Sequence, residues 1–173
     1  MTRRPVLTIW LLTLAVATAA CEDRRADKAY LRGDYGTAVK DLQSLANAGE
    51  ARAQYDLGVL YDKGQGVPQS DQEALQWYQR AAERGEPRAQ YNLGLMYLKG
   101  QGVQPNLVQA YYWVSLSAGH GHTHALDARD YISEKMTVEQ IVEGKRLVGD
   151  HEEQVKKQNA CLLCRVFRGA PAP

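Results

Sequence analysis

A short motif occurs twice in this chain with a spacing of 36 residues, and this repeat limits the fold more than any other feature. The segment Ala-Gln-Tyr-Asp-Leu-Gly at 53–58 returns as Ala-Gln-Tyr-Asn-Leu-Gly at 89–94. Other positions agree at the same offset: Tyr61 with Tyr97, Ala74 with Ala110, Trp77 with Trp113, and Lys-Gly-Gln-Gly-Val at 63–67 with 99–103. A constant period of this length is typical of stacked helical repeats, in which each unit buries its apolar face against its neighbours.

Each unit is predicted to contain two antiparallel helices. The first should run from about 51 to 62, because apolar residues recur at helical spacing between Ala53 and Tyr61. Gly64 is predicted to end this helix in a left-handed conformation, and Gly-Val-Pro at 66–68 turns the chain. The repeated tryptophans are interpreted as core residues.

The second helix of each unit follows a side chain that can cap its amino end. Asp34, Ser70 and Asn106 stand at equivalent positions of the repeat, and each such cap contributes about 1 kcal/mol. Ser70 is also followed by Glu73, which predicts a capping box. These caps predict the helix starts independently of the repeat alignment.

Two glycines lie inside the first helices, where glycine costs about 1 kcal/mol relative to alanine. Gly58 and Gly94 occupy the same position of the repeat. We interpret them as points where a neighbouring helix approaches closely.

The two ends of the array depart from the regular pattern. The offset maps 46–50 onto 82–86, so the first unit is predicted to consist of its second helix alone. Thr137-x-x-Gln140 forms another capping box, which opens a final helix to about Gln158. This helix is expected to shield the stack and to present a polar outer face. Its apolar residues, predicted to lie on the stack side, are Val138, Ile141, Val142, Val148 and Val155.

The helix pair, its period and its motifs (Ala-x-Tyr-x-Leu-Gly, Gly-x-Gly-Val and Trp-Tyr) resemble the Sel-1-like repeat family, whose members are related to tetratricopeptide repeats. The resemblance implies an all-α fold, a right-handed α-solenoid of antiparallel helix pairs with a C-terminal capping helix. The expected organisation is a signal peptide at 1–20, a linker or the start of the first helix at 21–33, the repeat solenoid at 34–136, the capping helix at 137–160, and a partly disordered Cys-x-x-Cys tail at 161–173.

The first twenty residues have the pattern of an export signal. Arg3 and Arg4 precede an uncharged run at 6–20 that ends in small residues. The residues before Cys21 resemble a bacterial lipobox, in which the cysteine is acylated and becomes the mature amino terminus. We therefore expect an exported, periplasmic lipoprotein that is anchored to a membrane by lipid on Cys21. Cleavage by an ordinary signal peptidase is the alternative, because Ala-Thr-Ala at 17–19 also fits its small-x-small rule.

Composition and motifs exclude several classes of function. The chain has 21 Lys+Arg and 20 Asp+Glu residues, whereas a nucleic-acid binder needs a concentrated basic surface. After the signal, no apolar run approaches the length that spans a bilayer. There is no Gly-x-Ser-x-Gly elbow, phosphate-binding loop or His-Glu-x-x-His. We therefore predict no catalytic residues, no cofactor and no nucleic-acid partner.

Cysteine and histidine supply two further candidate sites. If Cys21 is acylated, Cys161 and Cys164 remain as the two free thiols, and an oxidising compartment favours a local disulfide between them. Unreacted thiols and a metal or redox role are the alternatives.

The alternating histidines at 120, 122 and 124 could chelate a transition metal. The favoured interpretation is that His120 complements a helix carboxyl end and that the other two lie in an exposed turn.

The predicted function is a non-enzymatic interaction scaffold of the cell envelope that binds a partner protein or peptide. The resemblance implies that the first helices line the concave surface. The candidate contact residues on their solvent side are Arg52, Gln54, Asp56, Arg88, Gln90 and Asn92. The alternatives are an envelope enzyme with weak β-lactam hydrolysis or binding, as described for cysteine-rich relatives, and a redox accessory that uses the Cys-x-x-Cys tail. The oligomeric state is left open.

Overall fold

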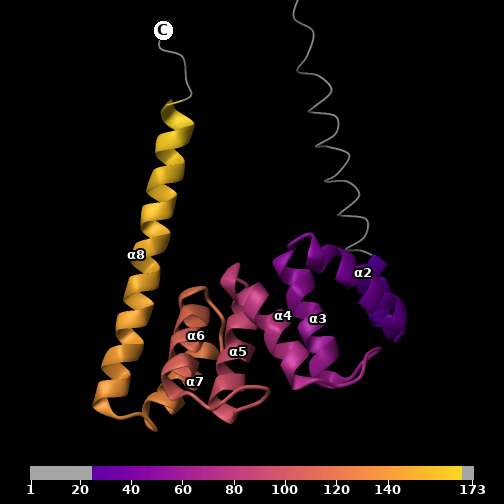
Figure 1. The fold of residues 1–173 in the computed structure, drawn as a ribbon, viewed down its shortest axis with the longest axis horizontal. Helices are drawn as coiled ribbons and strands as arrows, with labels where there is room; N and C mark the ends of the chain where they lie inside the picture. Colours follow the sequence, from indigo (N-terminus) through magenta and orange to yellow (C-terminus); the bar gives the residue numbers. More distant parts are fainter. Residues whose placement is uncertain (1–24, 169–173) are drawn as a thin grey trace, which may run out of the picture.

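The computed structural model describes residues 25–168, and the side chains of residues 25–160. Within this range every regular element is an α-helix, as predicted. A helical segment at 25–31 comes first. It is followed by α2 (Tyr35–Asn47), α3 (Ala51–Lys63), α4 (Asp71–Glu83), α5 (Pro87–Lys99), α6 (Leu107–Gly119), α7 (Ala125–Ser133) and α8 (Val138–Arg168). Figure 1 shows these helices as a row that follows the order of the sequence.

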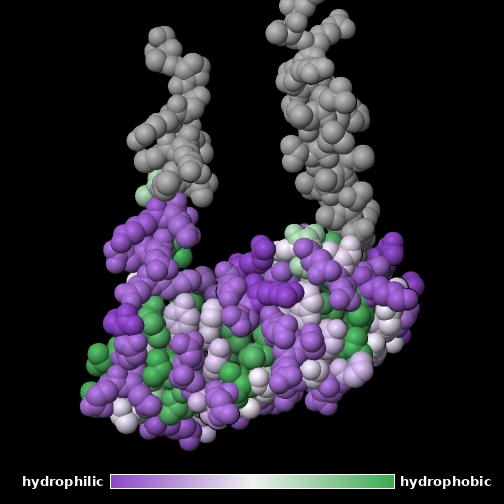
Figure 2. Space-filling view, viewed as in Figure 1, coloured by the Kyte–Doolittle hydropathy of each residue, from purple (hydrophilic) through white to green (hydrophobic). Residues whose placement is uncertain are grey.

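The helices pack mainly on their neighbours in sequence, which is the arrangement of a solenoid. The α3/α4 and α5/α6 pairs form the two complete units, and α4 packs on α5 between them. At the end of the array α8 packs on α6, and its carboxyl half extends beyond that contact (Figure 1). Where its side chains are described, up to residue 160, this protruding part of the helix is largely hydrophilic (Figure 2). Among the described helices, none is both long enough and apolar enough to cross a membrane.

The predicted helix caps are confirmed, with one change. The side-chain oxygens of Asp34, Ser70 and Asn106 accept hydrogen bonds from the backbone N–H three residues later, at 3.2, 3.2 and 3.0 Å. The backbone N–H of Ser70 donates to the carbonyl of Tyr61 at 3.0 Å, so it is not available for the second half of the predicted capping box. That bond ties the start of α4 to α3.

The glycines inside α3 and α5 mark close helix crossings, as predicted. A Cβ atom on Gly58 would lie 2.7 Å from the ring of Tyr78. A Cβ atom on Gly94 would press against Val114 of α6. These two positions let each first helix lie close against the second helix of its own unit.

The repeated tryptophans differ in burial, although their positions in the repeat are equivalent. Trp77 is 6% exposed and packs in a cluster with Leu42 and Leu57. Trp113 is half-buried at the edge of the next cluster, so the expectation that both are core residues holds fully for Trp77 alone.

The prediction that the first unit lacks its first helix is wrong. The segment at 25–31 is helical and buries Ala26 and Ala29 against the rest of the unit. It connects to α2 through a short turn in which Gly33 has φ 75°, whereas residues 64–70 make a longer loop in the next unit. The shorter connection breaks the 36-residue register, and the repeat pattern therefore missed this helix.

The last helix begins as predicted but is oriented differently. Thr137 and Gln140 form a complete capping box, with bonds of 2.9 and 3.3 Å. Val138 and Val142 are 72% and 62% exposed, so their predicted place on the stack side is wrong. Gly144 faces the stack instead, where a Cβ atom would lie 2.7 Å from the ring of Tyr111.

The C-terminal boundary also differs from the prediction. Helix α8 continues to Arg168, past the expected end at residue 160. Cys161 and Cys164 therefore belong to this helix rather than to a separate tail. Their side chains, and the whole of 1–24 with its predicted signal and Cys21, lie outside the described residues.

Candidate functional site

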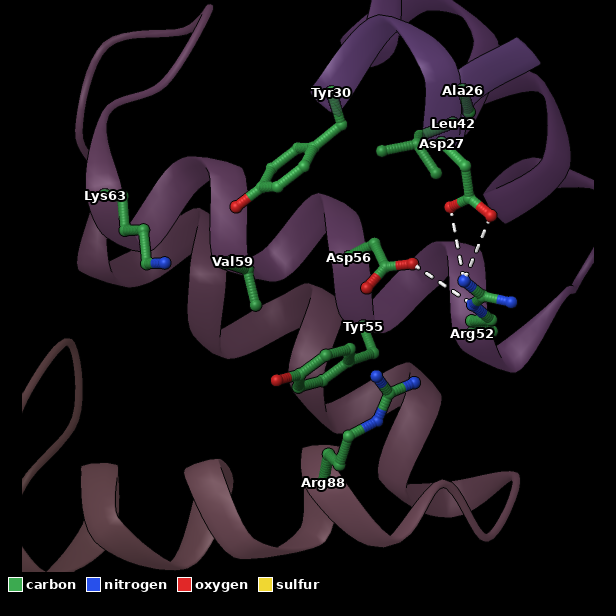
Figure 3. A pocket seen from close by; sticks show the side chains of 10 residues that line it. All are labelled: Ala26, Asp27, Tyr30, Leu42, Arg52, Tyr55, Asp56, Val59, Lys63 and Arg88. Carbon is green, nitrogen blue, oxygen red and sulfur yellow. Dashed lines mark hydrogen bonds and ion pairs between the residues drawn. The ribbon is translucent and has the colours of Figure 1, made fainter. Parts of the chain in front are cut away.

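An open pocket of about 320 Å³ lies between the helical segment at 25–31, α2, α3 and the start of α5. We call it the first-helix groove, and Figure 3 shows its lining. The lining residues are Ala26, Asp27, Tyr30, Leu42, Arg52, Tyr55, Asp56, Val59, Lys63 and Arg88. Because these residues come from three successive units, the groove depends on correct stacking of the array.

The groove has an apolar base between two aromatic rings. Ala26 and Leu42 are 1% and 3% exposed, and Val59 of α3 is half-buried beside them. Tyr30 and Tyr55 stand on opposite sides of this base (Figure 3). Such a surface favours an apolar side chain over a strongly hydrated one.

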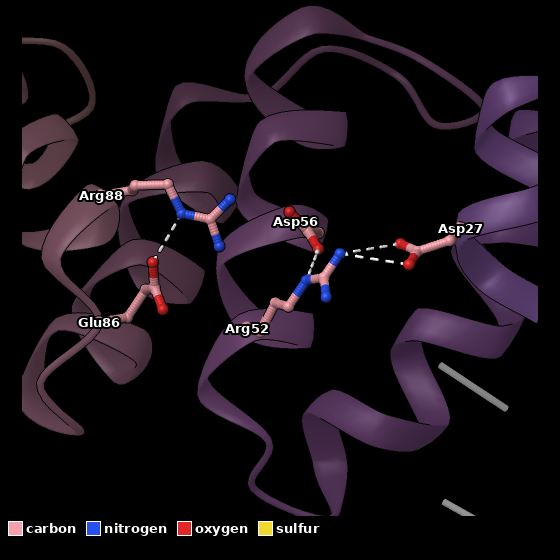
Figure 4. A network of polar contacts seen from close by, with 5 residues as sticks. All are labelled: Asp27, Arg52, Asp56, Glu86 and Arg88. Carbon is pink, nitrogen blue, oxygen red and sulfur yellow. Dashed lines mark hydrogen bonds and ion pairs between the residues drawn. The ribbon is translucent and has the colours of Figure 1, made fainter. Parts of the chain in front are cut away.

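Arg52 joins two carboxylates at one end of the groove (Figure 4). Its Nη2 atom lies 3.2 Å from each carboxylate oxygen of Asp27, and its Nε atom lies 3.6 Å from Oδ2 of Asp56. Asp27 belongs to the first unit and the other two residues to the second. The arginine therefore connects consecutive units, and its charge is balanced within the protein.

Arg88 has an equivalent position one repeat later and also contacts the preceding unit. Its Nε atom donates to Glu86 at 2.7 Å, and its guanidinium lies 4.3 Å from the ring centre of Tyr55. Cation–π contacts of this kind contribute about 0.5 to 1 kcal/mol at exposed sites.

Burial changes the acidity of two groups in the groove. It raises the pKa of Asp56, and the nearby arginines Arg88 and Arg52 only partly oppose this effect. Burial also raises the pKa of the Tyr55 hydroxyl. The carboxylate of Asp56 is thus held in a partly desolvated place where it depends on its arginine partners.

Three of the predicted contact residues, Arg52, Asp56 and Arg88, line the groove. Gln54 and Gln90 do not, and their predicted place on the solvent side is wrong. They are 4% and 1% exposed.

The two glutamines have a structural role. Their amide nitrogens donate to backbone carbonyls near the end of the preceding helix, Gln54 to Ala46 at 3.0 Å and Gln90 to Ala82 at 3.1 Å. These carbonyls lie in the last turns of α2 and α4, where each also accepts a backbone N–H, from Gly49 and Gly85 respectively. The repeated glutamine therefore fastens each unit to the one before it.

Asn92 also lies away from the groove. It is half-buried on α5, near the hydroxyls of Tyr55 and Tyr78, where it opposes the rise in their pKa that burial causes. Its position in the repeat matches that of Asp56, but its contacts are with the neighbouring α3/α4 pair.

Sequence reasoning missed the residues that give the groove its shape. Tyr30 and Asp27 fall in a segment that was assigned to a linker or to the start of the first helix, and Leu42 belongs to a second helix. Tyr55 and Lys63 recur one period later as Tyr91 and Lys99, so the repeat pattern indicated a role in the array rather than in binding. Nothing else in the sequence indicated that either residue would line a groove.

The three histidines do not converge on one point. His120 Nδ1 lies 2.8 Å from Oε1 of Gln90, whereas His122 stacks on Tyr91 with ring centres 4.5 Å apart. His122 is half-buried, which differs from the exposed turn predicted for it. Burial lowers the pKa of His122, and the neighbouring His124 adds to this effect. In the part of the chain with described side chains, no group of three His, Cys, Asp or Glu residues could hold a metal ion.

Comparison with known proteins identifies the repeat. Residues 51–86 and 87–122 each match the Sel1 repeat. No curated protein matches the chain with significance.

Two solved structures are similar to the described fold. One is a protective antigen present in uropathogenic Escherichia coli strains that displays an SLR fold. It has 24% identity and a TM-score of 0.73, and the match covers 90% of this chain and 33% of that protein. The other is a Sel1 repeat protein from Oxalobacter formigenes, with 32% identity and a TM-score of 0.61. That match covers 73% of this chain and 54% of the other. The chain thus spans about a third and about half of the length of these two proteins.

Proposed function

From the two consecutive Sel1 repeats that this chain carries at residues 51–122, we propose that it is a non-enzymatic scaffold that binds a partner protein or peptide in the first-helix groove. Sel1 repeats generally mediate protein–protein interaction, and the fold is typically that of a scaffold rather than an enzyme. The specific partner surface is our inference from the geometry of this chain.

The observation that carries the proposal is the groove itself. It combines an apolar base with a charged rim, which is the anatomy of a protein interface. Its lining is open to solvent and comes from helices that the array holds in fixed relation. A rigid, preformed surface loses little entropy on binding, so even a short array can hold an extended segment of a partner.

The proposal is tested by site-specific photocrosslinking in the organism that makes the protein. A photoreactive phenylalanine analogue replaces Tyr30 in the groove and, in a second variant, Gln76 on the exposed outer side of α4. We expect a discrete protein adduct from position 30 and none from position 76. Equal adducts from the two positions, or adducts from position 76 alone, would place the interaction surface elsewhere.

We further propose that the scaffold works in the bacterial cell envelope, anchored through lipid on Cys21. The support is the sequence of the first 21 residues, in which a basic start, an apolar run and small residues precede the cysteine. Labelling with a palmitate analogue should mark the parent protein, and Cys21→Ser should abolish the label. A parent protein without label would contradict the anchor and leave the groove unaffected.

A further inference from the structure

The charges that line the first-helix groove are not fully balanced among the residues that the structure describes. Arg52 is paired with Asp27 and Asp56, and Arg88 is paired with Glu86, which stands outside the lining. The remaining charged lining residue is Lys63.

Lys63 is the last residue of α3 and its side chain is exposed. Within the described part of the chain no carboxylate forms an ion pair with it. The two acidic and three basic lining residues leave a formal charge of +1, and Lys63 supplies the surplus.

The position of Lys63 suits it for contact with a ligand. Figure 3 shows its ammonium group at the end of the groove away from Arg52, on the same side as the hydroxyl of Tyr30. Val59 lies one helical turn before Lys63, on the apolar base between the two tyrosines. An apolar subsite and an uncompensated cation are therefore adjacent on one helix face.

We propose that the groove recognises a peptide segment in which an apolar side chain stands close in sequence to Asp or Glu. The apolar side chain lies over Val59 between Tyr30 and Tyr55, and the carboxylate pairs with Lys63. This assignment rests on the proposed function, because it names the chemistry of the partner that the groove would hold.

The internal ion pairs argue against the other charge arrangements. A ligand carboxylate placed at Arg52 would stand beside Asp27 and Asp56, which repel it. A basic ligand placed at these aspartates would have to displace Arg52 from both. Lys63, which has no ion-pair partner among the described residues, is therefore the cation left for a ligand carboxylate.

The size of the groove fits one anchoring side chain. Its volume of about 320 Å³ is at the lower end of the range of about 300 to 1,000 Å³ found for ligand pockets. Affinity should then depend strongly on the single apolar anchor and on the pairing beside it.

The test is selection from a random peptide library displayed on phage, with the purified protein as the target. Peptides enriched by the parent should carry an apolar residue close in sequence to Asp or Glu. A selected peptide should bind Lys63→Glu about tenfold more weakly in a fluorescence titration. Selection on Lys63→Glu should instead favour Lys or Arg beside the apolar residue.

The repeat supplies the matched control. Lys99 stands one period after Lys63, also exposed in the last turn of its helix, but it does not line the groove. Lys99→Glu should therefore select the same peptides as the parent. Val59→Trp fills the groove and should abolish enrichment, with circular dichroism showing that the variant is folded.

The outcomes separate this inference from the proposed function. If enriched peptides depend on Val59 but have no acidic preference, or are unchanged by Lys63→Glu, the inference is wrong and the groove remains a binding site. If peptides bind Val59→Trp as well as the parent, the selected peptides bind outside the groove and both proposals are wrong. If no peptide is enriched, this inference is wrong, and the crosslinking experiment decides the proposed function separately.

Discussion

Gly94→Ala tests whether adjacent helices are as closely packed as the structure shows. The added methyl group would press against a side-chain carbon of Val114. It would also lie 3.1 Å from the carbonyl oxygen of Ala110 and 3.2 Å from the backbone nitrogen of Val114. Two of these three contacts are backbone atoms of α6, which cannot move aside as a flexible side chain could.

The expected magnitude is the difference between two opposing effects. Inserting a methyl group into a tightly packed crossing costs about 1 to 3 kcal/mol. Replacing glycine with alanine in a helix recovers up to about 1 kcal/mol. Because the backbone of α6 is held by its neighbours on both sides, we expect a net loss of about 1 to 2 kcal/mol. The melting temperature should fall by about 3 to 6 °C.

Urea unfolding followed by circular dichroism measures this loss, and Gly149→Ala provides the control. Gly149 lies inside α8, and a Cβ atom there would meet nothing within 4 Å. The same substitution should therefore stabilise the protein by up to about 1 kcal/mol at this site. If Gly94→Ala is as stabilising as Gly149→Ala, the close crossing of α5 and α6 is not present in solution.

Three further predictions follow from individual contacts. Trp77→Ala should lower the free energy of urea unfolding by about 3 to 5 kcal/mol, and Trp113→Ala by clearly less, since Trp77 is buried and Trp113 is half-buried. Equal losses of unfolding free energy in the two variants would contradict this difference. Arg52→Glu should lower the melting temperature more than Arg52→Gln does, because it places a third carboxylate beside two aspartates. Burial lowers the pKa of His122, so its contribution to stability should be complete above about pH 6.5 and be lost as the pH falls through the folded-state pKa. The difference in unfolding free energy between the parent and His122→Gln should show this loss, and a difference that does not change with pH would contradict it.

The repeat pattern predicted the elements of the array well because each element is determined locally. Caps at Asp34, Ser70 and Asn106 act within one turn of helix, and glycine at 64 and 100 ends the first helices with positive φ. These signals need no knowledge of distant residues. A period of 36 residues then aligns the units without further information.

The groove could not be predicted in the same way, because its residues meet only through stacking. Arg52 and its partner Asp27 are 25 residues apart, an interval that does not match the repeat period. The helix that contributes Asp27 and Tyr30 lies out of register with the other units. Gln54 and Gln90 were misplaced for a related reason, since polarity suggested solvent where the structure has helix-end carbonyls that accept from the glutamine amides.

The equivalent positions of the repeat show which charges serve the array and which are left for a partner. Arg52 and Arg88 each reach back to the preceding unit, one to Asp27 and the other to Tyr55, so an arginine at this position connects neighbours wherever it occurs. A variant that loses both arginines would therefore weaken the stack that forms the groove, and lost binding would not identify a contact. Lys63 has no such backward contact with a carboxylate among the described residues, and it differs from Lys99 mainly in lining the groove. Comparison of these two lysines consequently separates recognition from stability, because the same residue type stands at the same helix end in both units.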